Sequence, residues 1–256
     1  MIKKFLKFFY RIFISINLDP KNLNSLRYLP KYLKSEKQWI KQGGKIDKRF
    51  IFLNDFESEA GYAKGEYFHQ DLHIAHLIFN ANPKRHIDVG SRIDGFVSHV
   101  AAFREIEVID IRPLKKSIHK NIKFIQADLM YPQDIEKTDS LSCLHAIEHF
   151  GLGRYKDPID INGHIKGIRN LISLLKKDGT FYLSFPVGHK DMIFFNAHRV
   201  FHPKTILKIP DVSKKLDLIR FDFVNQKGEL SLNTDLDRIS KEIKFGCGIY
   251  TFKKVL

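Results

Sequence analysis

The chain has 256 residues, 43% of them hydrophobic, and a formal net charge of +14. This length allows one large core, or a core with an appendage. Its two cysteines, Cys143 and Cys247, exclude a disulfide framework, and neither has a companion at CxxC spacing, so a reducing cytoplasm is the predicted setting.

The positive charge is concentrated at the N-terminus. Residues 1–50 hold 13 Lys or Arg and three acidic residues, a net of +10, which leaves +4 for the rest of the chain. We therefore predict a basic arm and connector over residues 1–50 and one main domain over residues 51–256.

The arm begins "MIKKFLKFFYRIFISINL", which as a helix would have one basic stripe and a broad apolar face. Lys7 and Arg11 interrupt the apolar run, so neither a secretory signal nor a membrane span is predicted. Two interpretations stay open: residues 2–17 lie on an anionic membrane surface, or they pack on the protein's own body or a second subunit. Nucleic acid is disfavoured, because the arm has no recognisable reading motif.

Regular patterning begins near residue 70. The stretch "DLHIAHLIFNA" has helical spacing and ends at Asn82-Pro83. Apolar strands and helices then alternate, which predicts a parallel sheet covered on both faces. The predicted strands are 85–89, 106–110, 122–126, 139–145 and 180–185, and the predicted helices are 94–103 and 163–176. The stretches "LDLIRFDFV" and "FGCGIYTFKKV" predict a final antiparallel pair.

The first strand of this series ends in a tight turn, "HIDVGSRIDG". Gly90 lets the backbone approach a ligand closely, and a helix that begins near Asp94 offers free N–H groups. A dinucleotide site requires GxGxxG, whereas Arg92 stands in the place of the second glycine. The turn therefore does not predict a pyrophosphate site.

Three successive strands end in aspartate, namely Asp88, Asp110 and Asp128. Ligands of open α/β sheets bind beyond the carboxyl ends of the strands, where an acidic side chain can take both hydroxyls of a ribose. Aspartate is also a common turn residue, so each one alone is weak evidence. Together they predict a nucleoside-binding edge.

The series "HIDVGSR", "VIDIR", "QADLM" and "LSCLHAIEHFG" resembles the motifs of class I S-adenosylmethionine-dependent methyltransferases, over about residues 60–210. Through "GEYFHQDL" and "FNAHRVFHP" it looks most like an uncharacterised bacterial group associated with surface-polysaccharide genes. The resemblance implies a Rossmann-like fold with a mostly parallel seven-stranded sheet and an antiparallel C-terminal edge hairpin. Residues 51–256 would then form a methyltransferase-like catalytic domain with S-adenosyl-L-methionine as cofactor.

The same resemblance implies roles for individual residues. Asp88 and Gly90 would lie by the methionine part of the cofactor, Asp110 on the ribose and Asp128 near the adenine. The remaining residues expected at the cofactor are Ser91, Arg92, Ile111, Leu129 and His145, the last on the floor of the site. Arg92 departs from the usual glycine; it either pairs with the methionine carboxylate or marks a site that has lost its cofactor.

A base for a hydroxyl acceptor is expected after the fourth strand, where "HAIEHF" brings His149 and Glu148 close to the methyl position. We predict His149 as the base and Glu148 as the group that orients it. The alternative is that both residues only shape the site. The order HAIEH lacks the HExxH spacing, so no metal site is predicted.

Two polar clusters are expected at the acceptor. Tyr67, His69 and Gln70 would form a lid helix, and a second group would hold a sugar or a phosphate-bearing glycan. The second group comprises Asn196, His198 and Arg199. Each cluster also has a purely structural alternative, the packing of a helix or the stabilisation of a loop.

The resemblance implies O-methylation of a cell-surface saccharide or its precursor by a cytoplasmic enzyme, peripheral on the inner membrane face if residues 2–17 bind lipid. The expected acceptor is a saccharide or a glycolipid-linked one. A non-catalytic binding or assembly module, which Arg92 favours, is the first alternative. A nucleic-acid methyltransferase is the second, and it is disfavoured because no NPPY-like signature follows the fourth strand.

Overall fold

The computed structural model describes residues 20–115 and 117–256, and these form two units. The first ends at Tyr62 and the second runs from Ala63 to Leu256. The structure thus places residues 51–62 with the N-terminal unit, whereas the sequence suggested a boundary after residue 50. The predicted amphipathic arm, residues 2–17, lies outside the described residues.

The first unit contains the 3-10 helices η1 (Pro20–Tyr28) and η2 (Asn54–Glu57) and the helix α2 (Leu29–Lys41). The indole N–H of Trp39 donates to the carbonyl of Lys45 at 3.1 Å, across the turn that follows α2. A Cβ at Gly44 would lie 2.3 Å from the Trp39 ring, so this close approach requires glycine. The single tryptophan therefore stabilises the end of α2.

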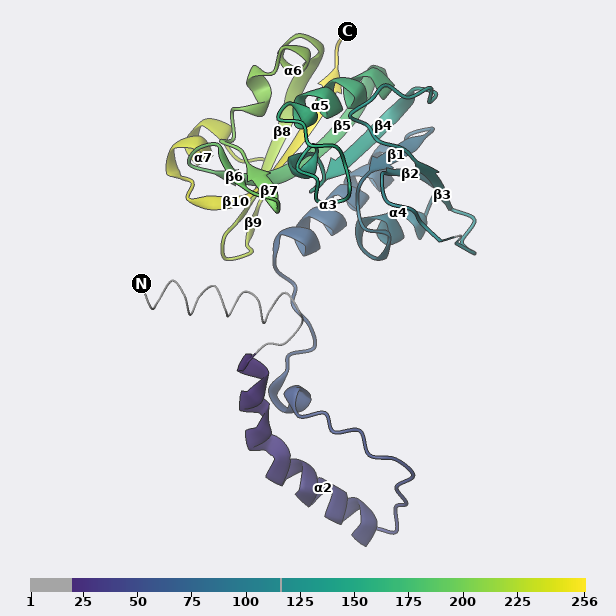
Figure 1. Ribbon diagram of the computed structural model, residues 1–256, viewed down its shortest axis with the longest axis vertical. Helices are drawn as coiled ribbons and strands as arrows, with labels where there is room; N and C mark the ends of the chain where they lie inside the picture. The colour runs from purple at the N-terminus through teal and green to yellow at the C-terminus, as the bar shows by residue number, and fades with distance from the viewer. Residues whose placement is uncertain (1–19, 116) are drawn as a thin grey trace. The chain divides into compact units, whose positions relative to one another are not determined.

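The second unit is built on one eight-stranded sheet in the order β3-β2-β1-β4-β5-β10-β8-β9 (Figure 1). Its strands are β1 (His86–Val89), β2 (Ile106–Asp110), β3 (Ile122–Gln126), β4 (Thr138–Leu144), β5 (Leu175–Gly188), β8 (Leu216–Asn225), β9 (Leu230–Ser231) and β10 (Phe245–Lys254). β1 to β5 run parallel to one another, and β10 is antiparallel to both β5 and β8.

The predicted fold class is confirmed, and β8 and β10 form the predicted antiparallel C-terminal pair. The last long strand, β10, lies between β5 and β8, so both of its edges hydrogen-bond to a neighbouring strand. The two-residue strand β9 pairs with β8 and adds an eighth strand to the predicted seven.

Helices cover both faces of this sheet, as Figure 1 shows. On one face α3 (Glu66–Ala81), the π-type turn η3 (Ile93–Val97) and α4 (Ser98–Ala101) pack with Ile106, Val108 and Ile249. On the other, α5 (Gly163–Leu174), α6 (Pro210–Lys215) and α7 (Leu236–Glu242) pack with Ile87, Leu141 and Phe252. Two separate cores therefore fix the sheet from either side.

The chain reverses its strand order between β1 and β4, which lie side by side although β2 and β3 come between them in the sequence. Such a switch point leaves a crevice at the carboxyl ends of the strands. The 3-10 helix η4 (Ile147–His149) follows β4 there, and the hairpin of β6 (Met192–Phe194) and β7 (His198–Val200) follows β5. Among the described residues, no helix has the length and apolar character that crossing a bilayer requires.

Candidate cofactor and acceptor site

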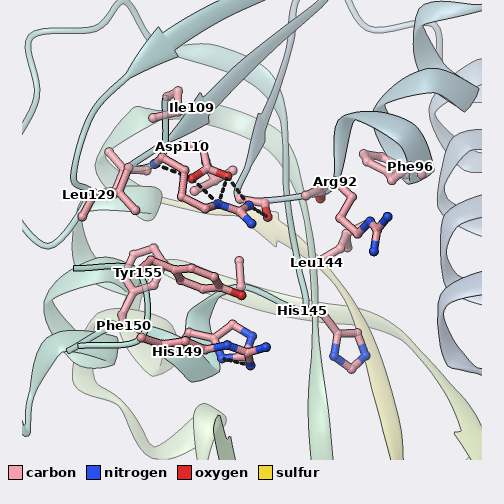
Figure 2. A pocket seen from close by; sticks show the side chains of 18 of the residues that line it. Arg92, Phe96, Ile109, Asp110, Leu129, Leu144, His145, His149, Phe150 and Tyr155 are labelled. Carbon is pink, nitrogen blue, oxygen red and sulfur yellow. Dashed lines mark hydrogen bonds and ion pairs between the residues drawn. The ribbon is translucent and has the colours of Figure 1, made fainter. Parts of the chain in front are cut away.

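A cavity of about 540 Å³ lies at this edge of the sheet, within the range of small-molecule sites. Two walls face each other across it (Figure 2). We call residues 89–95, 109–112 and 127–130, which follow β1, β2 and β3, the strand-end wall. Residues 149–157, which follow η4, are the loop wall.

Most of the predicted site residues meet at this cavity. Those that line it are Tyr67, Gln70, Gly90, Ser91, Arg92, Asp110, Ile111, Asp128, Leu129, His145 and His149. Those that do not line it are His69, Asp88, Glu148, Asn196, His198 and Arg199. Three members of the second group, Asp88, Glu148 and Arg199, are buried.

Gly90 keeps the strand-end wall open. Its φ is +79°, its N–H donates to the carbonyl of Ile109 at 2.9 Å, and a Cβ built on it would lie 2.6 Å from the Cβ of Ala146. No L side chain fits this backbone without strain and displacement of Ala146. Gly90 therefore lines the cavity with main chain alone, packed closely against Ala146.

Asp88 is a correction to the prediction that it contacts the cofactor. It is fully buried beneath the turn, where its carboxyl accepts hydrogen bonds from the hydroxyls of Ser142 at 2.6 Å and Ser91 at 2.8 Å. Burial raises the pKa of Asp88 to about 7, although these hydrogen bonds oppose the shift. Asp88 therefore holds Ser91 and the turn in place and does not face the cavity.

Asp110 lines the cavity, but its carboxylate is already paired with Arg112. The Arg112 backbone N–H donates to Oδ1 at 2.8 Å and its Nε to the same atom at 2.9 Å. The Arg112 guanidinium also lies over the ring of Tyr155, 4.6 Å from its centroid. Sequence reasoning missed Arg112, since an arginine two residues beyond a strand end gives no signal of its own.

Arg92 does not fill the cavity. Its Nε donates to Oδ1 of Asp94 at 2.9 Å, and both side chains are mostly exposed. The substitution of the usual glycine by Arg92 therefore leaves the cavity open. Asp128 lines the cavity as well, and its Oδ1 accepts the backbone N–H of Met130 at 2.8 Å.

His145 forms part of the cavity floor in a left-handed conformation, φ 49°. Its Nδ1 donates to Oε1 of Glu148 at 3.1 Å, and its Nε2 lies 3.3 Å from Sγ of Cys247. Burial lowers the pKa of His145, but the sulfur and the carboxylate outweigh it and raise the pKa well above its usual value. The Tyr67 ring packs 4.8 Å from the His145 ring.

His149 faces the cavity with a defined tautomer. Its Nδ1 donates to the carbonyl of Ala197 at 2.7 Å, so in the neutral ring Nε2 carries the lone pair. Burial, the largest effect, lowers the pKa of His149, and the charge of Arg154 acts in the same direction. The shift favours the neutral ring, the form that a general base requires.

Glu148 lies behind His149, with only 1% of its surface exposed. Its Oε1 is 3.7 Å from Nε2 of His149. Its other oxygen is one of four buried side-chain atoms without a hydrogen-bond partner in the described part of the chain, and a second is Nε2 of His198. The rings of His198 and His149 are 6.5 Å apart. Unpartnered polar atoms thus gather around the candidate base.

Arg199 is a second correction, because the prediction placed it at the acceptor. It is buried, and its guanidinium donates to the carbonyls of Phe150 at 2.6 Å and Glu148 at 3.3 Å. These bonds fix the chain after η4 and use up the donors expected for a glycan. Asn196 is exposed and does not line the cavity either, and His69 does not line it.

The loop wall supplies residues that sequence reasoning missed, Arg154, Tyr155 and Asp157. Asp157 shapes the wall, because its carboxylate accepts the backbone N–H groups of Gly151 at 2.9 Å and Gly153 at 3.1 Å. The spacing of two glycines and an aspartate in "GLGRYKD" was the available signal for an ordered loop. Within the described ranges, no group of three or more His, Cys, Asp and Glu side chains is arranged to hold a metal ion.

Solved methyltransferase structures share this fold. The N-methyltransferase NodS from Bradyrhizobium japonicum WM9, in complex with S-adenosyl-L-homocysteine, is 13% identical, with a TM-score of 0.51 over 74% of this chain and 88% of that one. The methyltransferase domain of bacterial CtHen1-C is 15% identical, with a TM-score of 0.53 over 75% of this chain and 100% of that one.

The fold also serves another reaction. The [4+2]-cyclase SpnF is 13% identical, with a TM-score of 0.50 over 72% of this chain and 81% of that one. At these identities the likeness shows the Rossmann-like methyltransferase fold, and the activity has to be argued from the site.

Comparison at the sequence level gives a family. No curated protein matches the sequence. Residues 101–240, more than half of the chain, match the family described as "Caenorhabditis protein of unknown function, DUF268". The chain therefore belongs to the DUF268 family.

Proposed function

We propose that the protein is an S-adenosylmethionine-dependent methyltransferase that methylates a hydroxyl of a saccharide or its precursor. One observation carries the proposal: the cavity places Gly90, Asp110 and Asp128 on one wall and His149 on the other. The methyltransferase neighbours that are crystallised with S-adenosyl-L-homocysteine support the choice of cofactor.

The strand-end wall fits a nucleoside ligand. Gly90 lines the cavity with main chain alone, which suits a ligand group in close contact with the backbone. The Asp110 carboxylate suits the two ribose hydroxyls, provided that Arg112 shifts or shares it. Bound S-adenosylmethionine supplies an already activated methyl group, so the protein needs chiefly to align the acceptor and remove its proton.

The loop wall fits proton removal. Nε2 of His149 accepts the proton of the acceptor hydroxyl, while the Ala197 carbonyl holds Nδ1–H and the orientation of the ring. Glu148, 3.7 Å from Nε2, stabilises the imidazolium that results.

Two properties from the sequence complete the proposal. The basic arm, residues 2–17, suits an acceptor carried on an anionic lipid surface, with the enzyme peripheral on the cytoplasmic face. The saccharide class comes from the resemblance to a group associated with surface-polysaccharide genes. Deleting residues 2–17 should then reduce partition onto anionic vesicles.

Calorimetry with S-adenosyl-L-homocysteine tests the cofactor. The absence of binding at millimolar ligand would eliminate the enzyme hypothesis and favour a non-catalytic binding module. The observation that supports this alternative is the pairing of Asp110 with Arg112. Transfer of tritium from labelled S-adenosylmethionine into a glycan fraction, and not into RNA, tests the acceptor class.

A further inference from the structure

Three arginines line the cavity, and two of them are neutralised by a carboxylate. Arg92 pairs with Asp94 and Arg112 with Asp110, each with an Nε to Oδ1 distance of 2.9 Å. Arg154 differs. Among the described residues no carboxylate lies within ion-pair distance of its guanidinium, whose Nη1 donates to the carbonyl of Ala197 at 2.9 Å.

Arg154 lies beside the candidate base. Its Nη1 is 3.5 Å from Nδ1 of His149, and its guanidinium carbon is 5.3 Å from the ring centroid of Tyr155. The carbonyl and the aromatic ring hold the group in place, while the side chain remains exposed. A planar guanidinium held in this way is suited to bind a carboxylate or a phosphate through two parallel hydrogen bonds.

Arg154 is also the candidate for the role that the sequence predicted for Arg199, the binding of a charged acceptor. The sequence predicted that Arg199 would hold a charged acceptor, but backbone carbonyls occupy its donors. The exposed residue next to His149 that retains free guanidinium donors and lines the cavity is Arg154.

We propose that Arg154 binds an oxyanion of the acceptor, a carboxylate or a phosphate, next to the hydroxyl that His149 deprotonates. This inference rests on the proposed methyl transfer and narrows its acceptor to anionic hydroxyl compounds, such as a uronic acid or a sugar phosphate. A neutral sugar would leave the Arg154 charge unbalanced at the base.

The test is calorimetry of the full chain saturated with S-adenosyl-L-homocysteine, with glucuronate, glucose 1-phosphate and glucose as probes. At least one anionic probe should bind more than about tenfold tighter than glucose. Arg154→Gln should lower the affinity for that probe about 10- to 100-fold, through the loss of charged hydrogen bonds, and leave the affinity for glucose unchanged. Arg154→Lys should recover part of the loss, since it keeps the charge but not the planar fork.

Lys156→Gln is the matched control, because it removes an exposed positive charge two residues away that does not line the cavity. An equal loss in Lys156→Gln would show a general charge effect and overturn the inference. So would equal binding of the three probes to the wild type, or unchanged binding in Arg154→Gln with its fold confirmed by circular dichroism.

Repeating the titrations without S-adenosyl-L-homocysteine separates this inference from the proposed function. If S-adenosyl-L-homocysteine does not bind but the binding of an anionic probe still depends on Arg154, the oxyanion site is supported and the proposed methyl transfer is refuted. If S-adenosyl-L-homocysteine binds and the affinity for the probes does not depend on Arg154, the proposed cofactor is supported and the inference is wrong. The preference between glucuronate and glucose 1-phosphate identifies the oxyanion.

Discussion

The two walls of the cavity satisfy their polar groups differently. On the strand-end wall the carboxyls of Asp110 and Asp128 already accept hydrogen bonds from Arg112 and the main chain, and beneath it Asp88 accepts hydrogen bonds from neighbouring serines. Around the loop wall, Oε2 of Glu148 has no partner, and Arg154 has no carboxylate among the described residues. Because a buried polar group without a partner is costly, its persistence points to a ligand or a reaction. The comparison suggests a preformed binding wall opposite a reactive one.

The largest expected effect breaks the loop wall. His149→Ala should lower kcat about 100- to 10,000-fold, the usual contribution of a general base, and leave the affinity for S-adenosyl-L-homocysteine nearly unchanged. Steady-state kinetics and calorimetry measure the two effects. In the wild type, activity should fall as the pH drops through the pKa of His149, which burial places below 6.5, and the variant should lack this limb. Equal activity in the variant would refute its role as base.

The second prediction concerns Asp88, which lies beneath the strand-end wall. Burial raises the folded-state pKa of Asp88 to about 7. Its contribution to the free energy of unfolding is therefore fully present below about pH 4 and is lost progressively as the pH rises to 7. Asp88→Asn should remove up to about 4 kcal/mol of this loss. Urea unfolding at pH 5 and pH 7.5 measures it: the free energy of unfolding of the variant, relative to wild type, should be more favourable at the higher pH. A difference independent of pH would contradict the assignment.

The third prediction sharpens the role of the strand-end wall. Asp110→Asn should lower the affinity for S-adenosyl-L-homocysteine about 10- to 100-fold, because the ribose hydroxyls lose a charged acceptor. Asp94→Asn is the matched control, since Asp94 lines the same cavity but is mostly exposed. Calorimetry should show little change for the control. Similar losses in both variants would mean that the overall charge of the cavity, and not the ribose contact, decides affinity.

The smallest expected effect tests the correction at Arg199. Arg199→Gln should lower the free energy of unfolding by about 1–2 kcal/mol through lost hydrogen bonds to the carbonyls of Glu148 and Phe150. The acceptor KM should change little in comparison with Arg154→Gln. Thermal unfolding and kinetics separate the two roles, and a stable variant with a strongly raised KM would return Arg199 to the acceptor site.

The sequence alone predicted four of the parallel strands closely: β2 and β3 have the predicted bounds, β1 begins one residue later, and β4 is shifted by one residue at both ends, whereas β5 is longer than predicted. Their apolar runs are local patterns that need no knowledge of distant segments. It did not predict that β10 would lie between β5 and β8, because the local pattern of a strand does not determine which distant strands pair with its two edges.

For the site, the sequence determined which residues gather, because the carboxyl ends of parallel strands must share one edge of the sheet. Asp110, Asp128, His145 and His149 meet at the cavity for that reason. Only the tertiary structure decided what each side chain does there. It buries Asp88, uses up Arg199 on backbone carbonyls and brings Arg154 next to His149, because hydrogen-bond partners and burial come from segments far apart in the chain.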